Sequence, residues 1–114
     1  MTYTTQISDQ IVRITLTGDM TGFEDSQSLL KAVDSIIKQG ILLCVADISQ
    51  IRYMNSSGIN TLTTLLTKFR TRGGEMVLTK PSEQVQKLLI ITKLNAIFTI
   101  VEDHAAAVVK LKSE

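Results

Sequence analysis

The feature of this sequence that most restricts its fold is a run of six apolar residues at positions 41–46, Ile-Leu-Leu-Cys-Val-Ala. An alternating pattern leaves one face of a strand in water, whereas a continuous apolar run is typical of a parallel strand covered on both faces. Apolar residues at helical spacing lie on either side of this run, at positions 29–37 and 59–69. The sequence therefore predicts a central parallel strand, with one amphipathic helix before it and another after it.

Two segments at the N-terminal end, residues 2–7 and 11–17, are rich in β-branched and aromatic residues, and Ser8-Asp9-Gln10 separates them. Within the second segment Val12, Ile14 and Leu16 alternate with polar side chains. This spacing predicts an antiparallel hairpin with one buried face.

The first helix is predicted to begin with a capping box formed by Thr21 and Glu24 and to end at Gly40. The remaining predictions follow in chain order: a loop at 47–54, a short strand at 75–79, a helix with Pro81 in its first turn, a short strand at 98–101, and a helix capped by Asp103. The predicted fold class is therefore α/β, a mixed β-sheet with an N-terminal antiparallel hairpin and about four helices packed against it. We expect a single domain over residues 1–114.

Composition excludes several classes of function. The 114 residues include 12 Lys and Arg against 11 Asp and Glu, whereas a surface that binds nucleic acid needs an excess of cations. The longest apolar run is far shorter than the roughly 20 residues of a membrane-spanning helix. The first residues show no basic segment followed by an apolar one, and a lone cysteine fits a reducing compartment. We expect a cytoplasmic protein that binds neither nucleic acid nor membrane.

Residues that commonly carry catalysis or hold metals form no recognisable motif. The segment Gly18-Asp19-Met20-Thr21-Gly22 lacks the spacing and the Lys-Ser/Thr ending of a phosphate-binding loop. His104 is the only histidine and has too few potential metal ligands close to it in sequence. Cys44 lies inside the most apolar run, which indicates an inert core residue. The sequence therefore predicts no enzyme activity, no cofactor and no metal site.

The most unusual segment is Met54-Asn55-Ser56-Ser57-Gly58, between the central strand and the second helix. Asn and Ser are preferred at helix N-termini because their side-chain oxygens accept hydrogen bonds from unpaired backbone N–H groups. A serine at that position is also exposed, and a phosphoryl group there meets the positive end of the helix dipole. Both interpretations, a helix cap and a modification site, stay open from local chemistry alone.

Residues 47–59, Asp-Ile-Ser-Gln-Ile-Arg-Tyr-Met-Asn-Ser-Ser-Gly-Ile, resemble the signature of the STAS domain, a family named for sulfate transporters and anti-sigma factor antagonists. Residues 15–19, Thr-Leu-Thr-Gly-Asp, are similar to a family strand that ends in Gly-Glu. Residues 73–77 and 85–89 resemble the family's Gly-Gly-strand element and its third helix. The resemblance covers nearly the whole chain.

Stand-alone STAS proteins of bacteria typically act in partner switching, so the resemblance implies an anti-sigma factor antagonist. In this scheme the unphosphorylated form binds a serine kinase of the histidine-kinase-like ATPase type, which is also the anti-sigma factor. The kinase phosphorylates the first serine of the motif and abolishes binding, and a PPM-type serine phosphatase reverses the change. By position the acceptor is Ser56, with Ser57 and Gly58 shaping the turn. The polar face of the following helix, including Asn60, Thr63 and Thr67, would border the docking surface.

Two positions differ from the family pattern. Asn55 stands where most kinase substrates of the family carry Asp. Thr21 stands two residues after Asp19, where the family often has a second acidic residue on the same rim. We therefore expect a partner-binding rim that includes Asp19, Thr21 and Asn55 and is less acidic than usual.

Other functions remain open at this point. The same switch could control secretion, biofilm formation or a second messenger instead of a sigma factor. A STAS protein that is never phosphorylated could serve as a scaffold of a signalling complex. A small-ligand or nucleotide-binding domain is a third class, although no set of residues supports it. The sequence also leaves open whether Ile90 or Ile91 is exposed and contacts a partner.

Overall fold

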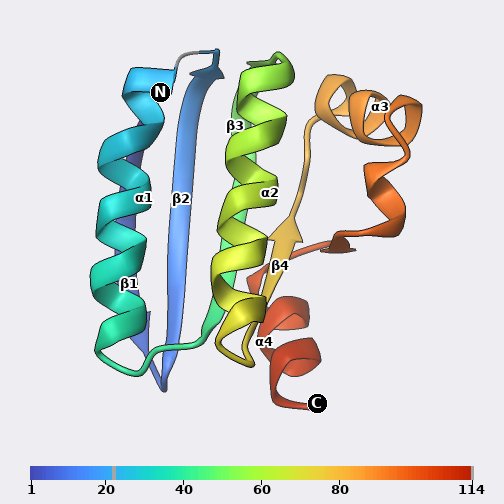
Figure 1. The fold of residues 1–114 in the computed structure, drawn as a ribbon. Helices are drawn as coiled ribbons and strands as arrows, with labels where there is room; N and C mark the ends of the chain where they lie inside the picture. Colours follow the sequence, from blue (N-terminus) through green and yellow to red (C-terminus); the bar gives the residue numbers. More distant parts are fainter. Residues whose placement is uncertain (22, 114) are drawn as a thin grey trace.

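The strands of this protein lie in the sheet in the same order as in the sequence. The computed structural model describes residues 1–21 and 23–113, and within them the sheet order is β1-β2-β3-β4-β5 (Figure 1). The elements are β1 (Thr2–Ser8), β2 (Ile11–Met20), α1 (Phe23–Lys38), β3 (Leu43–Met54), α2 (Ser56–Thr71), β4 (Glu75–Thr79), α3 (Glu83–Ile91), a 3₁₀ turn η1 (Leu94–Ala96), β5 (Thr99–Val101) and α4 (His104–Lys112).

The predicted hairpin and mixed sheet are confirmed. Strands β1 and β2 pair antiparallel, whereas β2–β3, β3–β4 and β4–β5 pair parallel. Asp9 and Gln10 connect β1 to β2, and both have positive φ, 54° and 66°, as expected of a two-residue type I′ turn. Strand β3 therefore occupies the centre of the sheet between two parallel neighbours, as its continuous apolar run indicated.

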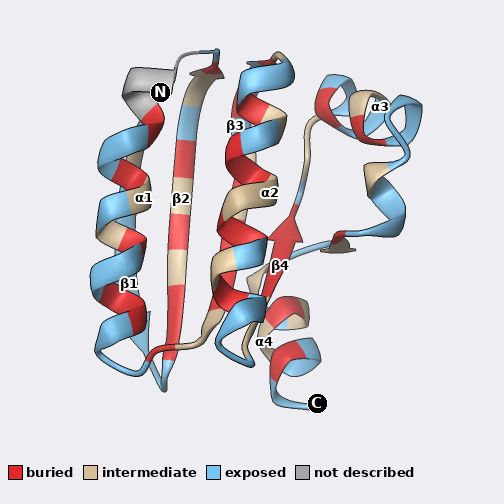
Figure 2. Ribbon diagram, viewed as in Figure 1, coloured by how far each residue is buried: buried red, intermediate tan, exposed pale blue. Residues whose placement is uncertain are grey.

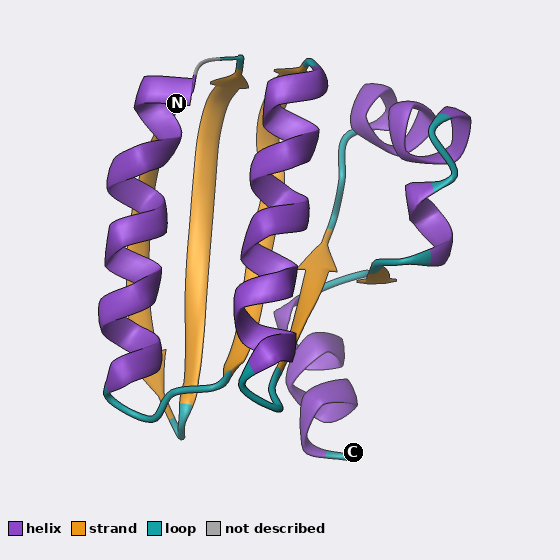
Figure 3. Ribbon diagram, viewed as in Figure 1, coloured by secondary structure: helices purple, strands orange, loops and turns teal. Residues whose placement is uncertain are grey.

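Helices cover both faces of the sheet (Figure 3). Helices α1 and α2 lie side by side on one face, where they bury the alternating residues Val12, Ile14 and Leu16 of β2 (Figure 2). Helix α4 packs on the opposite face through Ala107 and Leu111. Burying a leucine side chain stabilises a fold by about 1.5–3 kcal/mol, so Leu111 is a main anchor of α4.

Strand β3 is longer than predicted. It begins at Leu43 instead of residue 41 and runs to Met54, so the predicted loop at 47–54 is wrong. Beyond Asp47 only β2 continues to pair with it, and the register shifts twice there. These irregularities place the buried residues Ile48, Ile51 and Met54 three apart, which disguises the period of two expected of a strand.

Several helix ends can be compared with their predictions. Helix α1 ends at Lys38 and is followed by Gly40 with φ of 92°, as predicted, whereas the Glu24 side chain of the predicted capping box lies outside the described residues. Pro81 precedes α3 instead of lying in its first turn, because Ser82 is the N-cap and its hydroxyl accepts a hydrogen bond from the N–H of Val85 at 3.3 Å. Asp103 caps α4 as predicted.

Candidate functional site

The turn between β3 and α2 is held by Asn55. Its backbone is extended, and its Oδ1 accepts a hydrogen bond from the N–H of Gly58 at 3.1 Å. Helix α2 then begins at Ser56, so the helix-cap interpretation of this segment is confirmed with Asn55 as the capping residue. The cap leaves the two serines on the first turn of the helix.

The same turn is bound to the end of β2. The N–H of Asn55 donates to the carbonyl oxygen of Met20 at 3.3 Å, and its Nδ2 donates to the carbonyl oxygen of Thr21 at 3.1 Å. Gly58 is buried against this strand end, and a Cβ added there would lie 2.3 Å from the Met20 carbonyl oxygen. Only glycine fits this contact. The structure therefore brings Thr21, Asn55 and Gly58 together where β2 meets the start of α2.

Ser56 and Ser57 are both exposed, and neither hydroxyl has a hydrogen-bond partner among residues 1–21 and 23–113. The first turn of α2 contains no acidic residue. A phosphoryl group on Ser56 would therefore meet the positive end of the helix dipole without a neighbouring carboxylate on that turn. The site is suited to carry added negative charge.

The charges next to the turn come from Asp19 and Arg52. Their side chains approach to 3.4 Å, with 42% of the Asp19 side chain and 80% of the Arg52 side chain exposed. In the pairing of β2 with β3, Gly18 lies opposite Ile51 and Asp19 lies opposite Tyr53. Arg52 therefore lies at a register shift and has no partner residue in β2. An exposed pair of this kind contributes about 0–1 kcal/mol to stability, but it does neutralise Asp19 on the rim.

Sequence reasoning missed three residues near the turn. Arg52 and Tyr53 lie in the part of β3 that was predicted as a loop, and the Tyr53 side chain is exposed. The third is Thr61, which is buried and whose hydroxyl contacts Ser26 Oγ at 2.8 Å and donates to the carbonyl oxygen of Ser57 at 3.1 Å. A polar residue within the predicted apolar stripe of α2 was the available signal for this link to α1.

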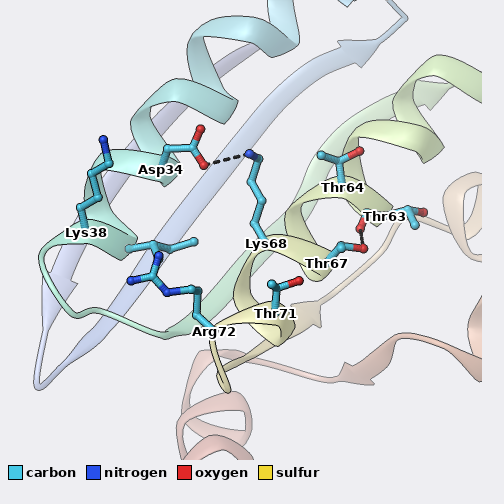
Figure 4. Close-up of a pocket in the computed structure, with 9 residues that line it drawn as sticks. Asp34, Lys38, Thr63, Thr64, Thr67, Lys68, Thr71 and Arg72 are labelled. Atoms are coloured by element: carbon cyan, nitrogen blue, oxygen red, sulfur yellow. Dashed lines mark hydrogen bonds and ion pairs between the residues drawn. The ribbon is translucent and has the colours of Figure 1, made fainter.

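The predicted docking face of α2 divides into two parts. Asn60 and Thr67 are exposed and Thr63 is half-buried, but only the two threonines line a groove of about 560 Å³ between α1 and α2 (Figure 4). Their hydroxyls donate to the carbonyl oxygens of the residues four positions earlier, at 3.0 and 2.9 Å. Because the hydroxyl protons are used in these bonds, the hydroxyl oxygens can act only as hydrogen-bond acceptors toward the groove. An ion pair between Lys68 and Asp34, 2.8 Å long, bridges the two helices there.

Apolar side chains are exposed on the other side of the turn. A hollow of about 210 Å³ lies between the end of β3 and α3, and Tyr53 and Leu88 contribute to its lining. Ile90 and Ile91 are 54% and 77% exposed, so both are exposed where the sequence left the choice open. The end of β3 therefore has exposed serine hydroxyls on the side of α2 and a hollow lined by Tyr53 and Leu88 on the side of α3.

The remaining reactive side chains lie away from this turn. Cys44 is fully buried in β3, and burial raises the pKa of its thiol, which fits the predicted inert core residue. His104 is the first residue of α4 and is half-buried. In the part of the chain that the structure describes, no group of three or more His, Cys, Asp or Glu residues could hold a metal ion.

Asp47 is the residue with the most strongly bound carboxylate. Burial by itself would raise its pKa, but hydrogen bonds outweigh this effect and hold the pKa below the usual value for aspartate. The Ser49 hydroxyl and N–H donate to Oδ1 at 2.7 and 3.0 Å, and Arg13 donates to Oδ2 at 3.3 Å. These contacts fix β3 where its pairing with β4 ends, which indicates a structural role.

Among residues 1–21 and 23–113, no helix is both long and apolar enough to cross a bilayer. Solved structures share the fold at low sequence identity. The Thermotoga maritima protein TM1081 superposes with a TM-score of 0.86 at 20% identity, over 96% of this chain and 94% of that one. An anti-sigma factor antagonist from Mycobacterium paratuberculosis gives 0.81 at 15% identity, over 97% and 93%.

The Bacillus protein SpoIIAA has the same fold in two states. Its unphosphorylated form, described as an anti-sigma factor antagonist, gives a TM-score of 0.74 at 14% identity over 96% of each chain. Its phosphorylated form gives 0.71 at 17% identity, over 92% of this chain and 96% of that one. The sequence profile of the STAS domain matches residues 2–107. This chain therefore belongs to the STAS domain family.

Proposed function

We propose that this chain is a regulatory binding module controlled by phosphorylation of Ser56. In its unphosphorylated form it binds a serine kinase of the histidine-kinase-like ATPase type that also acts as an anti-sigma factor. Phosphorylation of Ser56 abolishes this binding, and a PPM-type phosphatase restores it. The observation that carries the proposal is the exposed Ser56 hydroxyl at the first residue of α2 in a STAS fold, which has no hydrogen-bond partner among the residues that the structure describes.

The physical basis of the switch is the charge of the phosphoryl group. Phosphoserine adds about 1.5–2 negative charges near neutral pH. The α2 N-terminus can tolerate this charge in the free protein, because no acidic residue occupies the first turn. A partner surface docked on the neutral hydroxyl would suffer repulsion and desolvation of the phosphate. Couplings of about 1–3 kcal/mol change affinity roughly 5- to 150-fold, which is sufficient for a switch.

The surface around Ser56 supports a protein partner. Thr21 and Asn55 are polar but uncharged, and the carboxylate of Asp19 is paired with Arg52. Tyr53 and the hollow beside α3 add apolar contact area next to the hydroxyl. We propose that the partner surface is correspondingly near neutral, that the protein works in the cytoplasm as a single domain, and that it catalyses no reaction itself.

Intact-mass measurement and peptide mapping test the modification. The protein is incubated with ATP and a lysate of its own host, beside the variants Ser56→Ala and Ser57→Ala. Ser57 is the matched control because it is also exposed and lies on the same helical turn. We expect one added phosphoryl group on wild type and Ser57→Ala and none on Ser56→Ala. Modification at Ser57, or none in any sample, contradicts the proposal.

Binding variants then test the switch itself. Ser56→Ala should retain affinity for the kinase, whereas Ser56→Asp and Ser56→Glu should weaken it at least about fivefold. Equal binding of all four proteins would place the switch elsewhere. A protein that binds its partners without ever being phosphorylated would instead be a scaffold of a signalling complex.

A further inference from the structure

Strand β1 is an edge strand whose outer side is unpaired. It bonds to β2 along all seven residues in a regular register, from Thr2 opposite Thr17 to Ser8 opposite Ile11. No strand of the described chain lies on its other side. Because alternate residues of an antiparallel strand point their N–H and C=O groups away from the partner, half of these groups face the free edge.

This edge lacks the features that usually prevent edge-to-edge pairing. Its sequence, Thr-Tyr-Thr-Thr-Gln-Ile-Ser, has no charged residue and no proline. Unlike the β2–β3 pair, the β1–β2 pair has no register shift that would bend the edge away. The opposite edge, β5, is only three residues long. Long, regular and uncharged edges readily accept another strand, so β1 is the side of the sheet suited to extension.

The β1 sequence can pair with a second copy of itself. In an antiparallel pair centred on Thr5, all seven residues have a partner, and Tyr3 of one copy lies opposite Ile7 of the other. Aromatic and β-branched residues form favourable cross-strand pairs, and no like charges meet. Ile7 is 47% exposed in the single chain, so this pairing would cover an apolar side chain that is left in water.

The flank of α1 above β1 is compatible with such an approach. Ser28 faces β1, since its hydroxyl lies 2.9 Å from the Tyr3 hydroxyl. Ala32 and Ser35 follow Ser28 at spacings of four and three residues, so they lie on the same side of the helix. These side chains are small and uncharged, so the α1 helix of a second copy could pack beside them.

We propose that two copies of this chain associate through antiparallel β1–β1 pairing, with α1 packed against α1, to form one continuous sheet. Seven residue pairs make a strand contact about 24 Å long. The sheet layer and the helix layer lie about 10 Å apart, so the contact of both layers would bury on the order of 500 Å² of surface on each copy. This area is near the lower limit for a specific interface, so we expect a dissociation constant of about 10–500 μM. Strand β2 separates β1 from β3, so the dimer leaves both Ser56 hydroxyls exposed.

Charge exchange at Thr5 tests this interface, and sedimentation velocity over a range of concentrations measures it. Thr5→Lys and Thr5→Glu each place two like charges opposite one another on the two-fold axis. Each variant alone should bind itself about tenfold or more weakly than wild type. An equimolar mixture should regain association to within about threefold of wild type, because Lys then faces Glu.

Thr71→Lys is the control, since Thr71 is exposed at the far end of α2 and the substitution should not change association. Thermal melting of each variant establishes that it is folded, and recovery in the mixture cannot arise from unfolded protein. A wild-type protein that is monomeric at about 1 mM overturns the proposal. It is also overturned if the single variants associate as wild type does, or if their mixture stays monomeric.

Discussion

Replacing Gly58 by alanine should destabilise the protein, although the same change stabilises most helices. Gly58 is the third residue of α2 and is buried against the end of β2. A Cβ there would lie 2.3 Å from the carbonyl oxygen of Met20 and 2.6 Å from Cγ of Met54. Rotation of the Met54 side chain can relieve the second contact but not the first, because the first involves the backbone.

The size of the effect follows from these contacts. Alanine gains about 1 kcal/mol over glycine in a helix. To lengthen the Cβ–oxygen distance from 2.3 Å to 3.0 Å, the start of α2 must move away from β2 by about 0.7 Å. This movement breaks the two hydrogen bonds from Asn55 to Met20 and Thr21, each worth about 1 kcal/mol, and disturbs packing by a further 1–3 kcal/mol. The net loss is about 2–4 kcal/mol.

Urea unfolding followed by circular dichroism measures this loss. Gly40→Ala is the matched control, because Gly40 has φ of 92° but nothing within 4 Å of an added Cβ. The control therefore reports backbone strain without a clash, about 1–2 kcal/mol. If Gly58→Ala proves as stable as wild type or more stable, α2 does not press on β2 as the structure indicates, and the reasoning about the site fails.

Three further outcomes are expected. Asn55→Ala should lose about 2 kcal/mol in urea unfolding because it removes both the cap of α2 and the hydrogen bond to Thr21, whereas Asn55→Asp keeps the capping acceptor, loses only the Nδ2 donor and should lose about 1 kcal/mol. The lowered pKa of Asp47 contributes stability that is present above its unfolded pKa, near 4, and is lost as pH falls through the lower folded value. Thermal melts between pH 2 and 7 should therefore show the advantage of wild type over Asp47→Asn shrinking below about pH 4. Cys44 should react with a thiol reagent at least about a hundredfold more slowly in the native protein than in guanidinium, measured by absorbance.

The fold could be predicted from hydrophobic spacing because most elements bury one face in a regular pattern. The stripes of α1 and α2 and the alternation in β2 each identify an element and its buried side. Prediction failed in the second half of β3, where two register shifts replace the period of two with a spacing of three. The 3₁₀ turn after α3 was also missed, because its entry at Lys93 uses a positive φ without a glycine.

The site was predictable only as far as its chemistry is local. Asn55 and Ser56 follow one another at a helix start, so their roles as cap and exposed hydroxyl can be inferred from residue type alone. The contact of Gly58 with Met20 and that of Thr61 with Ser26 join residues 38 and 35 positions apart. The polar Thr61 in the apolar stripe of α2 indicates that it has a partner, but a single sequence does not identify that partner, because the packing of α1 against α2 decides it. The contact of Gly58 with Met20 depends in the same way on how the end of β2 lies beside the end of β3.

The C-terminal half of β3, which leads into the Ser56 turn, is held by fewer strand neighbours than the N-terminal half. From Gln50 to Met54 this strand pairs with β2 alone, since β4 pairs no further than Asp47. The turn therefore stands at the tip of a two-stranded, irregular ribbon that extends past the rest of the sheet. Backbone amides in such a ribbon should exchange hydrogen faster than those of the β3 segment next to β4. A docking protein would therefore contact a segment of β3 that one neighbouring strand holds, whereas two strands hold the segment from Leu43 to Asp47.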